Sequence, residues 1–359
     1  IESIDVYNLE EEKVKDAVAS LLTTGDLFTN PLQWKVALAV LGLAFLPITP
    51  MAAVGYFGAR SSGKSTIAQG MSTFLNPQWG PGKSPMATFN GTEAAMSIIS
   101  NGLDSCFLHV DDFRPAASRR SNEAALEALD ALLRRSHGSA GKQRGTFDAE
   151  SNQVGLAATD NARPLVVVTG EELPLGGNFA DSGLDRMLVI KMEPNRTFKP
   201  APDPQWVGDT RVDDGAKSLT EFTRRSTSGD FQIAGNAYLA HLAKIFNSVI
   251  AADPKGKIGI AENQLNLLRN TITAHTSRAF KEAGSHTRTS TRAQMLVASL
   301  SMGLWSLLDF AVEVGAFNQV DLIETLNRFT TELVEVVNHN NESVMGGNID
   351  VTEELLDQI

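Results

Sequence analysis

The sequence has 359 residues, of which 42% are hydrophobic and 20% charged, and its formal net charge is −11. This composition can bury a substantial core over two domains, or over one domain with a large appendage, and it excludes a disordered or collagen-like chain. The negative charge argues against a surface that coats itself with nucleic acid, although a small basic element inside a channel stays compatible with it. The single cysteine, Cys106, excludes a disulfide framework and favours a reducing, cytoplasmic location.

The first 50 residues are expected to form a helical lead-in, with helices over Glu10–Leu22 and Gln33–Leu46. Val36–Phe57 is long and apolar enough to span a bilayer, but Pro47 and Pro50 interrupt it. We therefore expect a buried helix, a turn and a central strand, and no membrane segment. The chain begins at Ile1 and ends soon after a helical pattern, so it is expected to be a fragment of a longer protein.

Residues 51–200 alternate short apolar runs with helical patterns, which predicts an α/β fold with a parallel sheet and helices on both faces. The expected strands are Ala52–Phe57, Met86–Phe89, Cys106–Val110, Leu165–Thr169 and Met187–Lys191. Phe198–Gly215, with three prolines, is expected to be a linker or an exposed loop. From 201 to 359 we expect an all-helical lid domain centred on the apolar helix Met295–Phe310.

The most specific motif follows the first expected strand and fits G-x-x-x-x-G-K-[ST], the phosphate-binding loop of P-loop NTPases. Its residues are Gly58, Ala59, Arg60, Ser61, Ser62, Gly63, Lys64, Ser65 and Thr66. Glycines let the backbone wrap around phosphate, and the helix that follows presents its positive end to the anion. Lys64 is expected to reach the β- and γ-phosphates of ATP, and Ser65 to ligate Mg²⁺.

Asp111 and Asp112 end the buried run that starts at Cys106, and two carboxylates at the end of a strand suit Mg²⁺–ATP hydrolysis. Asp111 is expected to hold the metal, and Asp112 to orient or deprotonate the attacking water. Most ATPases of the additional-strand class have glutamate at the second position. The shorter aspartate departs from that pattern at the general-base position.

A basic, glycine-rich segment at 138–147 lies between this acidic pair and the strand Leu165–Thr169. It predicts a hairpin that projects from the sheet and contacts nucleic-acid phosphates through Lys142 and Arg144. The alternative is a solvated surface loop.

The order of these motifs resembles the MCM-like AAA+ helicases of mobile genetic elements. The resemblance spans about residues 35–315, from the phosphate loop and the pair Asp111-Asp112 through Gly138–Gly145 and Val168-Thr-Gly-Glu171 to Asp185–Ile190 and Thr291–Met295. It implies a ring, of six copies by analogy, that binds ATP and Mg²⁺ between subunits and passes DNA through its channel.

The same resemblance assigns roles to four further residues. Thr169 at the strand tip corresponds to the sensor that contacts the γ-phosphate or the attacking water, with Glu171 as the competing candidate. Arg186 corresponds to an arginine finger for the neighbouring subunit and Arg292 to the second sensor; ordinary surface salt bridges are the alternative for both. The expected function is an ATP-dependent DNA translocase or helicase. The alternatives are an ATPase of the same fold that acts on protein and a P-loop kinase.

Overall fold

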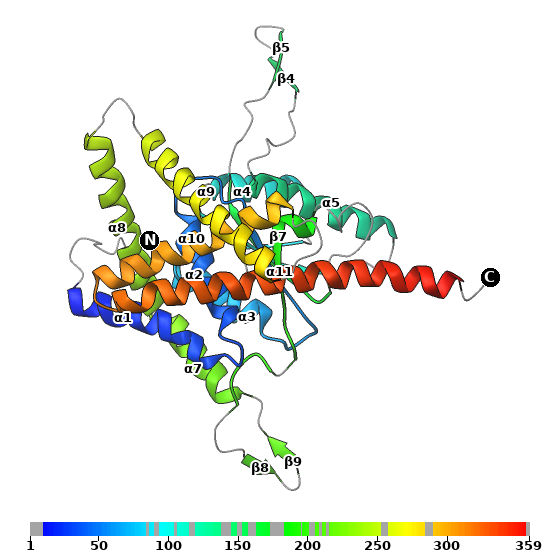
Figure 1. The fold of residues 1–359 in the computed structure, drawn as a ribbon, viewed down its shortest axis with the longest axis horizontal. Coiled ribbons are helices and arrows are strands. Elements are labelled where there is room, and N and C mark those ends of the chain that lie inside the picture. The colour runs from blue at the N-terminus through cyan, green and yellow to red at the C-terminus, as the bar shows by residue number, and fades with distance from the viewer. Residues whose placement is uncertain are drawn as a thin grey trace.

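The computed structural model describes residues 10–83, 86–89, 93–103, 106–114, 119–137, 145–148, 153–156, 163–172, 183–194, 196–200, 205–207, 210–212, 215–252, 258–283 and 290–356. Its centre is a parallel five-stranded sheet with the order β2-β3-β6-β1-β7 (Figure 1). The strands are β1 (Ala53–Phe57), β2 (Ala87–Thr88), β3 (Phe107–Phe113), β6 (Leu165–Gly170) and β7 (Met187–Lys191). All five predicted strands are therefore confirmed, and β3 runs three residues further than predicted, through both aspartates.

Helices cover both faces of the sheet. Successive residues of a strand point to opposite sides, so each strand contributes side chains to both cores. Val54 and Tyr56 of β1 face one core, which includes α2 (Leu32–Ala44) and α3 (Lys64–Ser72). Ala53 and Phe57 face the other core, which includes α4 (Glu93–Gly102) and α5 (Arg119–Ser136). Nearly every side chain of β1, β6 and β7 is buried, as expected for parallel strands with helices on both sides.

The region after residue 215 is helical within the described residues, as predicted. It contains α7 (Ala216–Thr227), α8 (Asp230–Ala252), α9 (Ile258–Glu282), α10 (Thr291–Glu313) and α11 (Gln319–Leu356). The predicted N-terminal helices are α1 (Glu11–Thr23), which a short turn η1 (Thr24–Leu27) follows, and α2. Side chains of α1, α2, the sheet, α8, α10 and α11 share one continuous core, so the lead-in packs on both the sheet and the C-terminal helices.

Helices α2 and α10 cross with their backbones in contact. A Cβ placed on Gly42 would lie 1.9 Å from the carbonyl oxygen of Gly303, and one on Gly303 would lie 2.2 Å from that of Ala39. Only glycine permits this approach. Among the described residues α10 is the helix that is long and apolar enough to cross a bilayer, and 78% of its apolar window is buried inside the fold.

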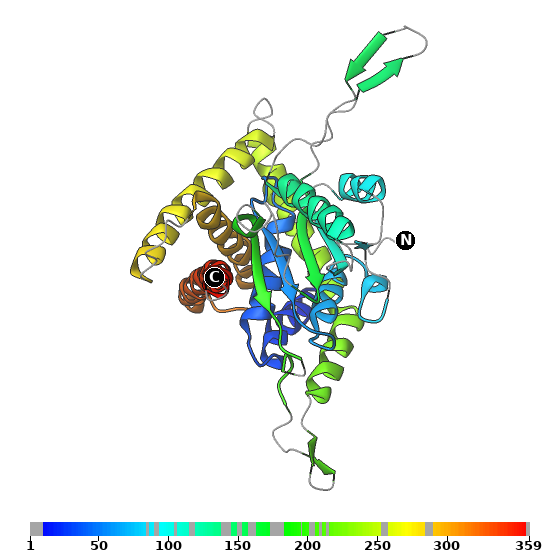
Figure 2. The same ribbon diagram turned by 90° about the vertical axis from the view of Figure 1, so that its right-hand side faces the viewer.

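Two antiparallel hairpins accompany the sheet. One pairs β4 (Gly145–Asp148) with β5 (Gln153–Leu156), and Figure 2 shows it standing away from the sheet. The other pairs β8 (Gln205–Val207) with β9 (Thr210–Val212), inside the segment that we predicted to be a linker or loop. The prolines favoured a loop there, but the short runs with valine on either side of Gly208-Asp209 favour a tight hairpin.

Candidate nucleotide-binding site

The glycine-rich loop joins the carboxyl end of β1 to the first residue of α3, Lys64. Two of its residues adopt left-handed backbone angles, Ser61 with φ 66° and Gly63 with φ 77°. Such alternation turns backbone N–H groups inward and creates an anion-binding concavity in front of a helix N-terminus. Lys64 is half-buried as a residue and its ammonium has no ion pair among the described residues, so it is available for an anion in the loop.

Residues 196–200, which follow β7, pack against this loop. Thr197 Oγ1 donates a hydrogen bond of 2.5 Å to the carbonyl oxygen of Ser62, and the Phe198 ring lies next to Gly63. Thr197 O in turn accepts from Thr29 N at 2.9 Å, which ties this segment to the N-terminal lead-in. Sequence analysis missed Thr197, because a lone hydroxyl beyond a strand carries no motif.

Asp111 is the meeting point of the predicted residues. Its Oδ1 accepts hydrogen bonds from Ser65 Oγ at 2.9 Å, from Thr169 Oγ1 and from the backbone N–H of Asp112 at 2.9 Å. These groups come from the start of α3 and the ends of β6 and β3. The strands β1, β6 and β3 are parallel neighbours, with β6 in the middle. The phosphate loop, Thr169 and Asp111 therefore lie together at the carboxyl ends of these strands.

Asp112 has a left-handed backbone with φ 65°, and the β3 ladder is irregular between Val110 and Phe113. Its carboxylate is bonded to Arg114, with Nε 2.5 Å from Oδ1, and Arg114 also pairs with Glu171 at 3.4 Å. The hydrogen bond to Asp112 is the main cause of the raised pKa of Arg114. Arg114 therefore bridges the two candidate bases, and its position two residues after Asp112 was the available signal in the sequence.

His109 lies fully buried behind the acidic cluster. Its Nε2 is 3.4 Å from Thr169 Oγ1, and its Nδ1 has no hydrogen-bond partner within the described part of the chain. Burial lowers the pKa of His109 to about 4, against an opposing effect of Asp111, so the ring is neutral at pH 7.

Arg186 lies at the amino ends of the strands, opposite to the carboxyl ends that carry the phosphate loop. It directly precedes Met187, which pairs with the first residue of β1, whereas the phosphate loop follows the last. Its side chain is 7% exposed and 3.9 Å from Asp130 Oδ1. Burial lowers the pKa of Arg186, and the positive charge of Arg292, exposed at the start of α10, lowers it further. The short helix η3 (Leu184–Arg186), which ends in Arg186, packs on α10.

The basic segment is only partly described. Lys142 and Arg144 lie outside the described residues, and the hairpin starts at Gly145, directly after them. A hairpin does follow the glycine-rich run, between α5 and β6. The contact of Lys142 and Arg144 with nucleic acid stays a prediction.

The oxygen ligands around Asp111 suit Mg²⁺. That ion binds through oxygen and commonly uses one or two carboxylates beside substrate phosphates. Ser65 Oγ and the Asp111 carboxylate, 2.9 Å apart, supply this donor set next to the phosphate loop. Across the described residues there is no group of three or more His, Cys, Asp or Glu side chains that could form a closed metal site.

No protein-family model matches the sequence, and no curated protein matches it. Among solved structures the chain is similar to the active helicase Cch of SCCmec type IV, with a TM-score of 0.48 and 14% identity. The match covers 90% of this chain and 51% of that one, so the chain spans about half the length of that structure. A likeness this weak carries no argument about the site, which depends on its own geometry.

Proposed function

We propose that this chain is a Mg²⁺-dependent ATPase of the AAA+ class. The observation that carries the proposal is the set of hydrogen bonds at Asp111, where a phosphate-loop hydroxyl and the hydroxyl at the end of β6 meet one carboxylate. The strand order supports the class, because a strand lies between the phosphate-loop strand and the acidic strand. An incidental glycine turn would not bring these three groups together.

Each residue then has a distinct task in hydrolysis. The loop amides and Lys64 bind the β- and γ-phosphates, and Ser65 and Asp111 hold Mg²⁺, which neutralises charge on the phosphate oxygens. Asp112 or Glu171 orients and deprotonates the attacking water, and Arg114 fixes the distance between these two carboxylates. Thr169 senses the γ-phosphate from the end of β6.

The two arginines support hydrolysis between subunits. Arg186 precedes the amino end of β7, away from the chain's own phosphate loop, and its short helix η3 packs on α10, which begins at Thr291-Arg292. An arginine there serves a nucleotide bound to a neighbouring copy, as in a ring, and a hexamer is the expected form. The finger role requires Arg186 to turn away from Asp130, since its side chain is largely covered in the single chain.

We further propose that the ATPase moves along DNA as a translocase or helicase. The support is the hairpin β4–β5, inserted between α5 and β6 directly after Lys142 and Arg144. Residues 145–156 carry no lysine or arginine, so we assign the contact with phosphates inside a channel to Lys142 and Arg144, which precede the hairpin in the sequence. An ATPase that acts on protein and a monomeric P-loop kinase are the competing outcomes of the test.

The test measures ATP hydrolysis by the purified chain alone, with single-stranded DNA and with duplex DNA. We expect Mg²⁺-dependent hydrolysis that DNA stimulates, no hydrolysis by Lys64→Ala, and normal hydrolysis by Lys244→Ala, which removes an exposed lysine on α8. Hydrolysis that DNA does not affect would favour the protein-directed ATPase. Phosphate transfer to a small acceptor by a monomer would favour the kinase, and no hydrolysis by the wild type would overturn the proposal.

A further inference from the structure

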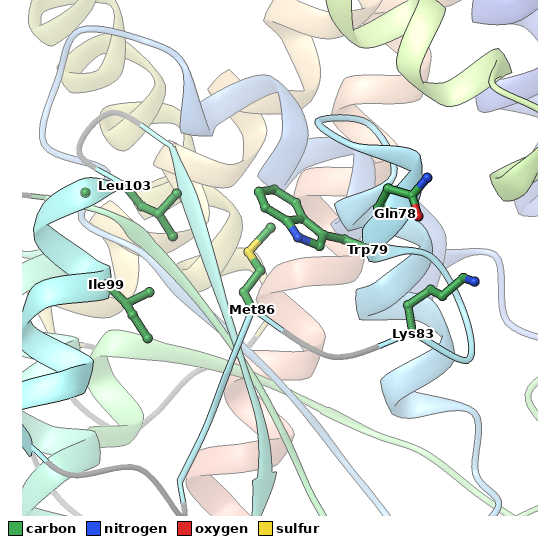
Figure 3. A pocket seen from close by; sticks show the side chains of 7 residues that line it. Gln78, Trp79, Lys83, Met86, Ile99 and Leu103 are labelled. Atoms are coloured by element: carbon green, nitrogen blue, oxygen red, sulfur yellow. The ribbon is translucent and has the colours of Figure 1, made fainter. Parts of the chain in front are cut away.

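A groove of about 610 Å³ lies at the β2 edge of the sheet, between the segment that follows α3 and helix α4 (Figure 3). Its size falls within the range typical of ligand sites. Trp79 and Met86 face Ile99 and Leu103 across the groove, and Gln78 and Lys83 lie on the side of Trp79 away from α4. The groove therefore has an apolar floor and a polar rim.

Trp79 differs from the tryptophan that holds the core together. Trp34 is fully buried, is stacked on Phe28 and donates its indole N–H to Leu21 O at 2.8 Å. Trp79, at the end of the short helix η2 (Pro77–Trp79), is only half-buried and has neither an aromatic neighbour nor an indole hydrogen bond among the described residues. A flat side chain held in a groove without a partner is the arrangement that stacks on a nucleobase.

Lys83 adds a positive charge at the rim of the groove. Its side chain is exposed and, within the part of the chain that the structure describes, forms no ion pair. In a chain of net charge −11, an uncompensated cation beside an aromatic ring is complementary to a phosphate attached to a stacked base. The exposed amide of Gln78 can bond to the base or the backbone.

Both walls of the groove are attached to the proposed nucleotide site. Gln69 of α3 binds the loop that carries Lys83, donating to Lys83 O at 3.0 Å and accepting from Gly82 N at 3.1 Å. On the other wall, Met86 precedes β2, whose Thr88 pairs with Asp111, and Phe89 N donates to Asp111 O at 3.2 Å. These hydrogen bonds connect one wall of the groove to α3 and the other wall to β3.

We propose that this groove binds an unstacked base of single-stranded DNA, with Trp79 stacked on the base and Lys83 paired with the adjoining phosphate. The inference rests on the proposed function, because it names a DNA-contact site separate from the hairpin. Single-stranded DNA is the occupant that uses both features, since bases inside a duplex are stacked on one another and an apolar peptide leaves Lys83 without a partner.

The test measures the affinity of the full chain for a fluorescein-labelled oligothymidylate by anisotropy, over a series of salt concentrations. Loss of one stacked base costs about 1–3 kcal/mol, so Trp79→Leu should weaken binding roughly 5- to 150-fold, whereas Trp79→Phe should restore most of it. Lys83→Ala should reduce the slope of log affinity against log salt by about 0.7. The matched control is Ile98→Ala on α4, a residue 72% exposed and outside the groove, and it should bind as the wild type does.

The outcomes separate this inference from the proposed function. If the wild type binds DNA and is stimulated by it, but Trp79→Leu and Lys83→Ala leave affinity and salt slope unchanged, the groove proposal is wrong and the proposed function stands. If Trp79→Leu changes the mass of the assembly at unchanged DNA affinity, the groove holds protein and the proposal is also wrong. A wild type that does not bind DNA overturns the groove proposal and the translocase role, and leaves the ATPase proposal to the hydrolysis assay. Should Trp79→Leu lose its fold by circular dichroism, the exposed Lys83→Ala decides the matter through the salt slope.

Discussion

Thr169 Oγ1 donates a hydrogen bond to Oδ1 of Asp111, joining the carboxyl ends of β6 and β3. A threonine hydroxyl has one proton, so at 3.4 Å its oxygen can only accept from the Nε2 of His109. This fixes the His109 tautomer and leaves Nδ1 as the unprotonated nitrogen. The result is a chain of hydrogen bonds from buried His109 through the Thr169 hydroxyl to Asp111, the proposed metal ligand.

Thr169→Val removes this hydroxyl at nearly constant shape. We expect kcat to fall about 100-fold, the scale of losing one donor at a reacting centre, while the Kd for ATP changes little. Thr169→Ser keeps the hydroxyl and should recover most of the rate. Steady-state hydrolysis and fluorescent ATP-analogue binding check this. An unchanged kcat in Thr169→Val would assign the sensor role to Glu171 instead.

Asp112→Asn should bind Mg²⁺–ATP as the wild type does and lose turnover, because an amide cannot take a proton from water. Glu171 is the alternative base, because Arg114 contacts both it and Asp112. If Asp112→Asn hydrolyses ATP at the normal rate, Glu171→Gln should be inactive. Asp321→Asn, at an exposed position of α11, controls for loss of a negative charge.

Arg186→Ala should bind ATP normally and hydrolyse it roughly 10³- to 10⁵-fold more slowly, as expected for loss of an arginine finger. Mixing it with Lys64→Ala tests whether it acts on a neighbour. In mixed rings some interfaces combine an intact loop with an intact finger, so part of the activity should return. Mixed rings that form but stay inactive would mean that Arg186 acts within its own chain or only through Asp130. Full activity of Arg186→Ala alone would end the finger assignment.

His137 makes the stability of the chain depend on pH. Burial, together with the positive charges of Arg186 and Arg292, lowers its pKa to about 4, against the opposing backbone contacts with Leu133 and Met51. The unfolded chain, with a histidine pKa of about 6.5, binds this proton first. The free energy of unfolding should therefore fall as pH decreases from about 6.5 to about 4, by about 3 kcal/mol at most from this group.

His137→Gln should flatten that pH dependence, since it cannot take up the proton. Urea unfolding of both proteins over this pH range measures the difference directly. Parallel curves for the variant and the wild type would show that His137 binds its proton at the same pH in the folded and the unfolded chain.

Much of the fold was predictable because its signals are local. The strand Met187–Lys191 agrees with the prediction at both ends, and the helix after Pro31 begins within a residue of the expected position. The hairpin Gln205–Val212 was missed because three prolines outweighed two runs of only three residues. In the site, Arg114 and Thr197 were missed, since neither belongs to a motif and their partners are set by the fold.

The sequence by itself determined the phosphate loop, the acidic pair and the alternation of strands and helices. Each is a contiguous pattern whose physical cause, backbone freedom at glycine or period-two burial, lies within a few residues. Only the tertiary structure decided that β6 lies between β1 and β3, and so brought Ser65, Asp111 and Thr169 to one carboxylate. It also packed η3, which ends in Arg186, on α10 and placed Trp79 opposite Ile99. These relationships depend on how strands are ordered by crossovers and on which helix faces meet, and no local pattern encodes the partner of a lone side chain.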